Sequence, residues 1–140
     1  LCEEAKAGKP LLGICLGMQL LFDESDEFGI HEGLHLIPGR VEAFPKDIDL
    51  LVPQMGWNQN VVNNEQSIFA DVLDGSYTYF VHSYYAKCDQ QYVVSYTDYG
   101  VKVPSCVEFK NVYGMQFHPE KSGKKGLEML ERFIERVDER

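Results

Sequence analysis

The pattern of apolar positions near the start of the chain changes period at residue 15. A continuous apolar run at residues 11–14 predicts a strand buried on both faces. Beyond it the spacing becomes helical, with Met18, Leu21 and Phe22 on one side. This change of period predicts that Cys15 lies on a tight turn between a strand and a helix.

The rest of the chain reads as a succession of strands followed by one helix. Strand-like segments occur at residues 36–44, 50–62, 77–86, 92–97 and 104–117. We expect the last of them to be a hairpin that turns near Lys110 and Asn111. The tail predicts an amphipathic helix, whose apolar face would consist of Leu127, Leu130, Ile134 and Val137. Because no repeat or linker interrupts the pattern, residues 1–140 are interpreted as a single domain.

Composition narrows the class of protein. The chain has 140 residues, 44% of them hydrophobic, which is ordinary for a globular domain with one core. No apolar run approaches the roughly 18 residues needed to span a membrane, so no membrane partner is expected. The net charge of −9 argues against nucleic acid as a partner, because affinity for phosphates comes largely from basic groups. The four cysteines form no C-x-x-C pair, and their scattered positions are typical of the reducing cytoplasm.

Cys15 is a candidate nucleophile because of its immediate neighbours. Gly13 and Gly17 flank it in a G-x-C-x-G pattern, the thiol counterpart of the G-x-S-x-G nucleophile elbow. Both glycines are expected to make room where backbone segments come close. The start of a helix would also favour the thiolate. The alternative is a core cysteine between two loop glycines.

A second candidate site is the H-E-x-x-H pattern at residues 31–35, a signature of zinc metalloproteases. That signature requires a helix, which puts both imidazoles on one face. Gly33 lies inside the pattern and Pro38 follows it, and both residues disfavour a helix. We therefore interpret His31 and His35 as solvated loop residues, and we expect no metal.

A histidine and a glutamate near the C-terminal end can assist Cys15. The strand ending in "GMQF" is followed by His118, Pro119 and Glu120. A nucleophilic thiol needs an imidazole to take its proton, and the imidazole needs a carboxylate to fix its tautomer. In open α/β sheets sites collect at the carboxyl ends of strands, so the two strand ends can meet. The alternative is an ordinary turn that contains both residues.

Taken together, "GICLGMQ" and "QFHPE" resemble the class I, triad-type glutamine amidotransferases. The resemblance implies an α/β fold of the flavodoxin-like type, with an open, mostly parallel sheet, flanking helices and additional antiparallel strands in the C-terminal half. It implies that Cys15 is the nucleophile, His118 the general base and acid, and Glu120 the orienting carboxylate, with no cofactor. The implied oxyanion and glutamine-binding positions are Leu16, Gln19, His82, Ser83 and Tyr84.

The segments "VPQMGWN", "YFVHSYYA" and "FHPEKS" are similar to the subfamily of glutaminase subunits of imidazole glycerol phosphate synthases. That resemblance implies glutamine as substrate, a partner that is a (β/α)8 cyclase subunit, and a role in histidine biosynthesis. It places an interface at Met55, Trp57, Asn58, Tyr79 and Lys121. Position 54 departs from the pattern, because it is Gln54 where the subfamily usually has histidine.

Two further expectations stay open at this point. The chain opens with helix formers but no capping residue, so we expect the family's N-terminal strands and glycine loop to lie upstream of residue 1. The alternative functions are a glutaminase for GMP, anthranilate or carbamoyl phosphate synthesis, and a non-enzymatic domain of the same fold.

Overall fold

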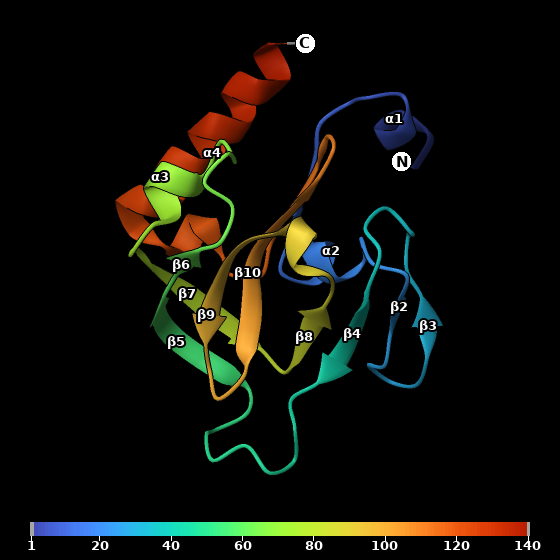
Figure 1. Cartoon of the computed structure of the whole chain (residues 1–140), viewed down its shortest axis with the longest axis vertical. Helices are drawn as coiled ribbons and strands as arrows, with labels where there is room; N and C mark the ends of the chain where they lie inside the picture. The colour runs from blue at the N-terminus through green and yellow to red at the C-terminus, as the bar shows by residue number, and fades with distance from the viewer. Residues whose placement is uncertain (1, 140) are drawn as a thin grey trace.

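The computed structural model describes residues 2–139. The helical segments are α1 (Cys2–Lys6), α2 (Leu16–Gln19), α3 (Ala70–Leu73) and α4 (Gly123–Asp138), with single 3-10 turns η1 (Gln90–Tyr92) and η2 (Pro119–Lys121). The strands are β1 (Leu11–Ile14), β2 (Glu24–Ser25), β3 (His31–Glu32), β4 (Arg40–Ala43), β5 (Gln54–Gln59), β6 (Val61–Val62), β7 (Tyr77–His82), β8 (Tyr84–Lys87), β9 (Val93–Asp98), β10 (Lys102–Phe109) and β11 (Val112–Met115). Figure 1 shows α4 on one side of the strands, and β2, β3 and β4 on the other.

The largest sheet has the strand order β1-β11-β10-β9-β6. β1 and β11 run parallel, whereas the other neighbours in this sheet are antiparallel. The α/β class and the antiparallel strands of the C-terminal half are therefore confirmed. The fold differs from the expectation in one respect: among the described strands, parallel pairing is limited to β1–β11 and β2–β4. The physical reason is that β9, β10 and β11 are joined by short hairpin connections, which permit only antiparallel neighbours.

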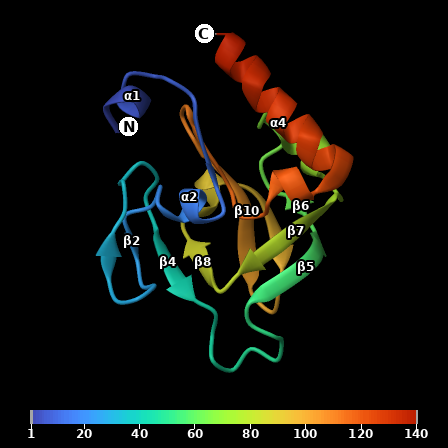
Figure 2. The same ribbon diagram turned by 180° about the vertical axis from the view of Figure 1, so that it is seen from behind.

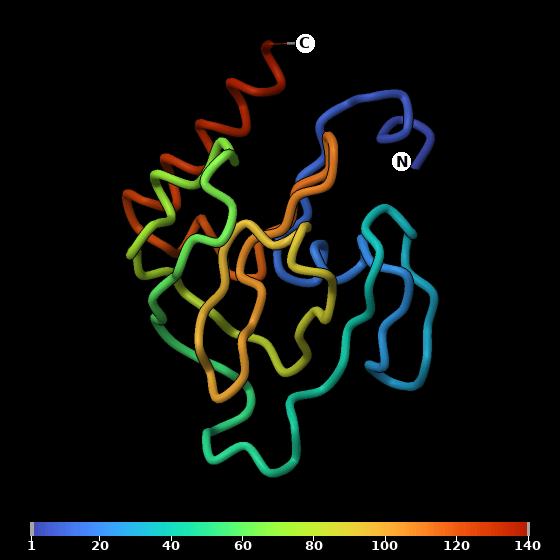
Figure 3. The backbone as a smooth tube through the Cα atoms, viewed as in Figure 1, coloured from blue at the N-terminus to red at the C-terminus, as the bar shows by residue number. Residues whose placement is uncertain are grey.

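The predicted hairpin at the C-terminal end of this sheet is confirmed. β10 and β11 pair from Phe109 opposite Val112 to Cys106 opposite Met115, and Lys110 adopts a positive φ of 58° in the turn. The tip of the hairpin lies beside the segment that leads into β1 (Figure 3), where the amide of Leu11 donates to a carbonyl in the turn at 3.0 Å. This contact starts the parallel register that later brings the ends of β1 and β11 together.

Two smaller sheets complete the strand content. One has the order β3-β2-β4-β8, and the other is a two-stranded ribbon of β5 and β7. We call the latter the β5–β7 ribbon. Its antiparallel register runs from Gln54 opposite His82 to Gln59 opposite Tyr77. β7 leads through Ser83 directly into β8, so the ribbon and the second sheet share one corner of the molecule.

The apolar side predicted after the turn at Cys15 is buried. Met18 and Phe22 have no exposed surface, and Leu21 retains 2%. They belong to a core cluster that also contains Ala5, Leu36, Ile37, Val41, Ala86, Val107 and Val112. The strand before the turn is less buried than expected, since β1 lies at one end of the strand order and Leu11 is half-buried.

The C-terminal helix is confirmed, but the prediction of its buried face was wrong. Met129 is fully buried, whereas Leu127, Ile134 and Val137 are 57%, 58% and 41% exposed. The helix packs instead through a face that contains Gly126, where an added Cβ would lie 1.9 Å from the carbonyl oxygen of Pro119. Figure 2 shows that the C-terminal end of α4 stands clear of the strands. On the packed face, Phe133 meets the ring of Tyr113 with centroids 5.9 Å apart.

None of the helices within residues 2–139 combines the length and the apolar character that crossing a membrane requires.

Candidate active site

Cys15 occupies the turn between β1 and α2 in a backbone conformation that few residues adopt. Its φ is 54° and its ψ is −108°, and an unusual conformation of this kind typically costs about 1–3 kcal/mol. The amide of Cys15 donates to the carbonyl of Met115 at 2.7 Å, which fixes the turn to the end of β11. A Cβ on Gly13 would lie 2.5 Å from the carbonyl oxygen of Gly17, whereas a Cβ on Gly17 would meet nothing within 4 Å. The nucleophile-elbow geometry is therefore present, and of the two flanking glycines Gly13 is the one that makes room for it.

His118 follows β11, the parallel neighbour of β1, and its position is fixed from both sides. Its amide donates to the carbonyl of Tyr79 at 2.9 Å, and its carbonyl accepts from the hydroxyl of Ser122 at 2.6 Å. The ring Nδ1 is 2.6 Å from Oε1 of Glu120. Since a carboxylate accepts, this contact assigns the proton to Nδ1 and leaves Nε2 as the basic nitrogen.

Cys15 and His118 line one open cavity of about 470 Å³. All five predicted oxyanion and glutamine-binding positions line it as well, and so do three residues that sequence reasoning did not select: Leu16, Gln19, His82, Ser83 and Tyr84, together with Ile14, Glu27 and Val81. The cavity lies where β1 and β7 end, and where the segment after β11 turns into η2. A cavity of this size accommodates a small substrate.

The electrostatic environment of Cys15 differs from the expectation of a ready thiolate. Burial raises the pKa of the Cys15 thiol, the backbone N–H of Leu16 opposes that effect, and the carboxylate of Glu120 raises the pKa further. α2 has only four residues, so its dipole is too small to reverse the effect of burial. The resting thiol is therefore protonated at neutral pH, and its ionisation requires a base in the same cavity.

The remaining cysteines are free thiols in less accessible surroundings. Cys106 is fully buried, and burial raises the pKa of its thiol far above the ordinary value. Burial likewise raises the pKa of Cys88 to about 12. Cys2 and Cys88 are half-buried and pack against a core cluster. These three cysteines act as small packing side chains, and among them full burial is limited to Cys106.

His82, the last residue of β7, is held in its neutral form. Burial lowers its pKa to about 4, and the hydrogen bond from Nδ1 to the carbonyl of Tyr84, at 2.8 Å, opposes the shift. Gln54, its cross-strand partner, is fully buried and donates to the side chain of Asn58 at 3.0 Å. The glutamine at position 54 thus holds Asn58 on the inner face of the ribbon, away from the predicted interface.

The other four predicted interface residues do gather on one surface. Met55 and Trp57 are 62% and 53% exposed on β5, and the Trp57 and Tyr79 rings meet edge-to-face with centroids 6.0 Å apart. The ammonium of Lys121 lies 6.0 Å from the centroid of the Tyr79 ring. Met55, Trp57, Tyr79 and Lys121 are called the ribbon face below. Val81 lies on the same side of β7 and also lines the cavity, so the ribbon face borders the cavity.

The H-E-x-x-H segment does not have the geometry that its pattern requires. His31 lies in β3, and His35 lies in the following loop with a positive φ of 55°. Residues 31–35 therefore do not form a helix, which confirms the prediction. Nε2 of His31 is 2.8 Å from the carbonyl oxygen of Phe28, and Nδ1 of His35 is 3.0 Å from Oδ1 of Asp23. Across residues 2–139, no group of three histidine, cysteine or acidic residues is arranged to hold a metal ion.

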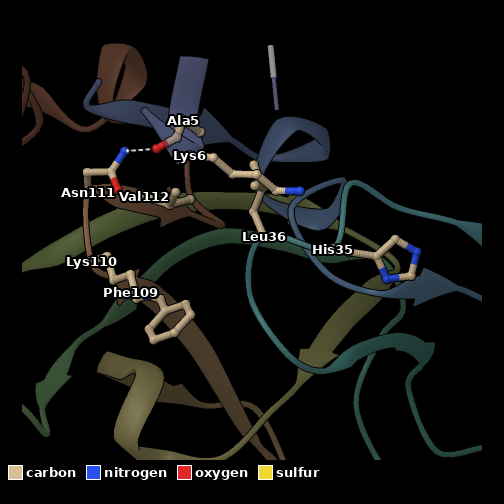
Figure 4. A pocket seen from close by; sticks show the side chains of 8 residues that line it. All are labelled: Ala5, Lys6, His35, Leu36, Phe109, Lys110, Asn111 and Val112. Atoms are coloured by element: carbon tan, nitrogen blue, oxygen red, sulfur yellow. Dashed lines mark hydrogen bonds between the residues drawn. The ribbon is translucent and has the colours of Figure 1, made fainter. Parts of the chain in front are cut away.

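A second hollow lies at the opposite end of β1 (Figure 4). It is lined by Ala5, Lys6, His35, Leu36, Phe109, Lys110, Asn111 and Val112. The amide of Asn111 donates to the carbonyl of Ala5 at 2.8 Å, which fastens α1 to the β10–β11 turn. This hollow lies at the amino end of β1, whereas sites in α/β sheets form at the carboxyl ends, where Cys15 is found.

Two polar residues of the site, Glu27 in the cavity and Gln116 behind Cys15, were missed by sequence reasoning. Glu27 places a half-buried carboxylate in the cavity, and it comes from a loop that carries no recognisable pattern. Gln116 is fully buried between core residues of the strand end, and its side chain reaches Sγ of Cys15 at 3.8 Å. A signal for Gln116 was available, because it is the one polar position in an otherwise apolar stretch immediately before His118.

Comparisons with known proteins agree with this geometry. A relative from Lactiplantibacillus plantarum, named imidazole glycerol phosphate synthase subunit HisH, is 58% identical over 133 residues, which are 95% of this chain. A protein of the same name from Listeria monocytogenes is 50% identical over 133 residues, again 95% of this chain. The chain spans 64% of the length of each of these relatives.

Solved structures share the fold. The crystal structure of a protein described as a putative GMP synthase subunit, from Thermoplasma acidophilum, has a TM-score of 0.69 at 17% identity, and the match covers 99% of this chain and 62% of that one. A second structure, described as a glutamine amidotransferase, has a TM-score of 0.68 at 18% identity over 98% of this chain and 66% of that one. The family profile described as "Glutamine amidotransferase class-I" matches residues 1–137. With a match of that extent, and with the elbow cysteine and His118 on one cavity, the chain belongs to the class-I glutamine amidotransferase family.

Proposed function

We propose that this chain hydrolyses the side-chain amide of glutamine, with Cys15 as nucleophile, His118 as general base and acid, and Glu120 as the carboxylate that orients the imidazole. One observation carries the proposal: Cys15 on its elbow and His118 on Glu120 line the same cavity. Similarity to proteins named imidazole glycerol phosphate synthase subunit HisH supports it.

The first half of the reaction forms a thioester. Nε2 of His118 takes the proton of the Cys15 thiol, and Sγ attacks the side-chain carbonyl carbon of glutamine. The resulting oxyanion accepts a hydrogen bond from the amide of Leu16, which follows the nucleophile directly. When the intermediate collapses, the C–N bond breaks, His118 returns its proton to the leaving nitrogen, and ammonia departs.

The second half releases glutamate. A water molecule gives a proton to His118 and attacks the thioester carbonyl carbon. Collapse of this intermediate breaks the C–S bond, and the Cys15 sulfur recovers the proton from His118. Nucleophile and acid–base chemistry account for every proton and bond, so the reaction needs no metal or organic cofactor.

Polar groups around the cavity suit a free amino acid. The carboxylate of Glu27 complements the α-ammonium group of glutamine, because charge-assisted hydrogen bonds are the strongest available for that group. Gln19 uses its amide nitrogen within the protein, toward the carbonyl of Tyr84 at 2.9 Å, so its carbonyl oxygen is the group that serves the substrate. Ser83 and His82 complete the polar lining at the end of β7.

The ribbon face is proposed as the surface that binds a (β/α)8 cyclase subunit. Exposed aromatic and methionine side chains are typical of protein interfaces, and this group of them borders the cavity where ammonia is released. The ammonia would pass to the cyclase and be built into imidazole glycerol phosphate, with release of an aminoimidazole carboxamide ribotide, in histidine biosynthesis. Four free thiols suit an enzyme of the reducing cytoplasm.

The test is a glutaminase assay with and without the cyclase subunit of the L. plantarum relative's enzyme. We expect glutamate release to rise when the cyclase and its substrate are both present, and to be abolished in Cys15→Ser. A diazo-ketone analogue of glutamine should label Cys15. Labelling of Cys88 or Cys2 instead would contradict the assignment of the nucleophile. Stimulation by a GMP or anthranilate synthase subunit, but not by the cyclase, would reassign the partner.

A further inference from the structure

Gln116 connects two parts of the site, the nucleophile and Gln19, through its side-chain amide. Its Nε2 lies 3.8 Å from Sγ of Cys15, and its Oε1 lies 3.0 Å from Nε2 of Gln19. Gln116 is fully buried and Gln19 is 6% exposed, so these polar groups must find their partners inside the protein. The two long polar side chains therefore form a buried network behind the nucleophile.

The orientation of both amides follows from one backbone carbonyl. The carbonyl of Tyr84 can only accept, so the atom of Gln19 that lies 2.9 Å from it is the nitrogen. The same nitrogen lies 3.0 Å from the Gln116 amide, so the Gln116 atom facing it is the oxygen. The remaining Gln116 atom, the one that faces Sγ of Cys15, is therefore an N–H donor.

We propose that Gln116 is a positioning residue of this active site: its amide N–H holds the sulfur of Cys15, and its carbonyl oxygen fixes the amide of Gln19. The proposal deepens the glutaminase function proposed above, because it concerns the same nucleophile and the same substrate pocket. Its observable consequence, the ionisation of the Cys15 thiol, is independent of glutamine turnover.

A donor at this place stabilises the charged form of the sulfur. Burial raises the pKa of the Cys15 thiol, and the Gln116 side chain is one of the groups that oppose this effect. The backbone of Gln116 is itself fixed, since its amide donates to the carbonyl of Ser105 at 2.8 Å on the neighbouring strand. The donor is thus held by the sheet and is ready before a substrate arrives, as preorganised electrostatic catalysis requires.

The test measures the rate of Cys15 alkylation by iodoacetamide as a function of pH, with the Cys15 peptide quantified by mass spectrometry. Gln116→Met keeps the length and burial of the side chain but removes both hydrogen bonds. We expect the apparent pKa of Cys15 to rise by about one unit, so that alkylation at neutral pH slows about tenfold. Gln54→Met is the matched control, because Gln54 is equally buried but makes its hydrogen bond to Asn58.

Cys106 reports whether each variant is folded, since it is fully buried and should stay unlabelled in the native state. If Gln116→Met exposes Cys106, the same measurement is made on Gln19→Met instead. That change frees the Gln116 amide to rotate and should also raise the Cys15 pKa. In folded proteins, a Cys15 pKa unchanged by Gln116→Met, or by Gln19→Met if that variant carries the test, would overturn the proposal. A raised pKa in a chain that does not hydrolyse glutamine would support the positioning role and refute the glutaminase function.

Discussion

Gly13 and Gly17 are so close that the carbonyl oxygen of Gly17 lies 2.5 Å from the place where a side chain on Gly13 would begin. Real Cβ atoms do not come so near to backbone, so Gly13→Ala must displace the elbow that carries Cys15. We expect the free energy of unfolding to fall by roughly 1–3 kcal/mol, as for other overpacked sites. Urea denaturation measures the loss.

Gly17→Ala is the matched control for that change. The added methyl group meets nothing within 4 Å, and the residue lies in α2. Alanine is favoured over glycine in helices by about 1 kcal/mol, so stability should stay equal or rise. Equal losses in both variants would show that the close approach at Gly13 does not shape the elbow.

The second prediction concerns the carboxylate behind His118. Glu120→Gln keeps a hydrogen-bond partner 2.6 Å from Nδ1 but removes the negative charge that stabilises the imidazolium. We expect kcat for glutamine hydrolysis to fall about 10²–10⁴-fold. Glu42→Gln serves as the control, since Glu42 pairs with Arg40 and Lys87 in the second sheet, away from the cavity. Similar kcat values for both variants would show that the charge of Glu120 does not contribute to catalysis.

The third prediction concerns substrate affinity. If the Glu27 carboxylate binds the α-ammonium group, Glu27→Gln should raise KM for glutamine about 10–100-fold, the usual worth of a hydrogen bond between charged groups. Glu24→Gln, three residues earlier and paired with Arg40, should leave KM near its original value. Steady-state assays separate KM from kcat. A selective loss of kcat in Glu27→Gln would instead point to a role in the chemical step.

The elbow and the histidine–glutamate pair could be predicted because each depends on residues close together in the sequence. A change of hydrophobic period located the turn at Cys15, and the apolar pattern before His118 located β11, which ends at Met115. That the two would meet required only the parallel pairing of β1 and β11, with Ile14 opposite Met115. Short-range pattern and one rule of sheet topology were sufficient for this part of the site.

The rest depended on contacts that periodicity does not encode. The helical pattern of α4 offered two apolar faces, and the close fit of Gly126 against Pro119 selected the one that contains Met129. Asn58 alternates away from Trp57 along β5, so its partner is Gln54 on the inner face of the ribbon. Glu27 enters the cavity from an irregular loop, whose path no local pattern fixes.

The fourth prediction concerns stability at mildly acidic pH. The pKa of His82 is lowered from 6.5 in the unfolded chain to about 4 in the folded protein. The unfolded chain therefore binds more protons between these values, so the stabilisation is complete above pH 6.5 and is lost as the pH falls towards 4. The loss should amount to about 3 kcal/mol in the free energy of unfolding.

His82→Asn tests this assignment, because asparagine can donate to the carbonyl of Tyr84 but does not titrate. Urea denaturation at pH 7 and at pH 4.5 should show a large loss for the original protein and a smaller one for the variant. A variant that loses as much stability on acidification as the original protein would assign the effect to other groups.

The last prediction concerns the ribbon face. Trp57 is half exposed and makes its ring contact with Tyr79 at the surface, so Trp57→Ala should change the stability of the isolated chain by about 1 kcal/mol or less. If this face binds the cyclase subunit, the same change should weaken the complex by about 2 kcal/mol or more, a loss of roughly 30-fold in affinity, because tryptophan is a frequent hot spot. Leu127→Ala removes an equally exposed apolar side chain from α4, on a different surface, and should leave the affinity unchanged. Titration calorimetry with the cyclase subunit distinguishes the two variants. A loss of affinity confined to Leu127→Ala would place the interface on the exposed side of α4. Equal affinities for the original protein and both variants would exclude the ribbon face as the centre of the interface.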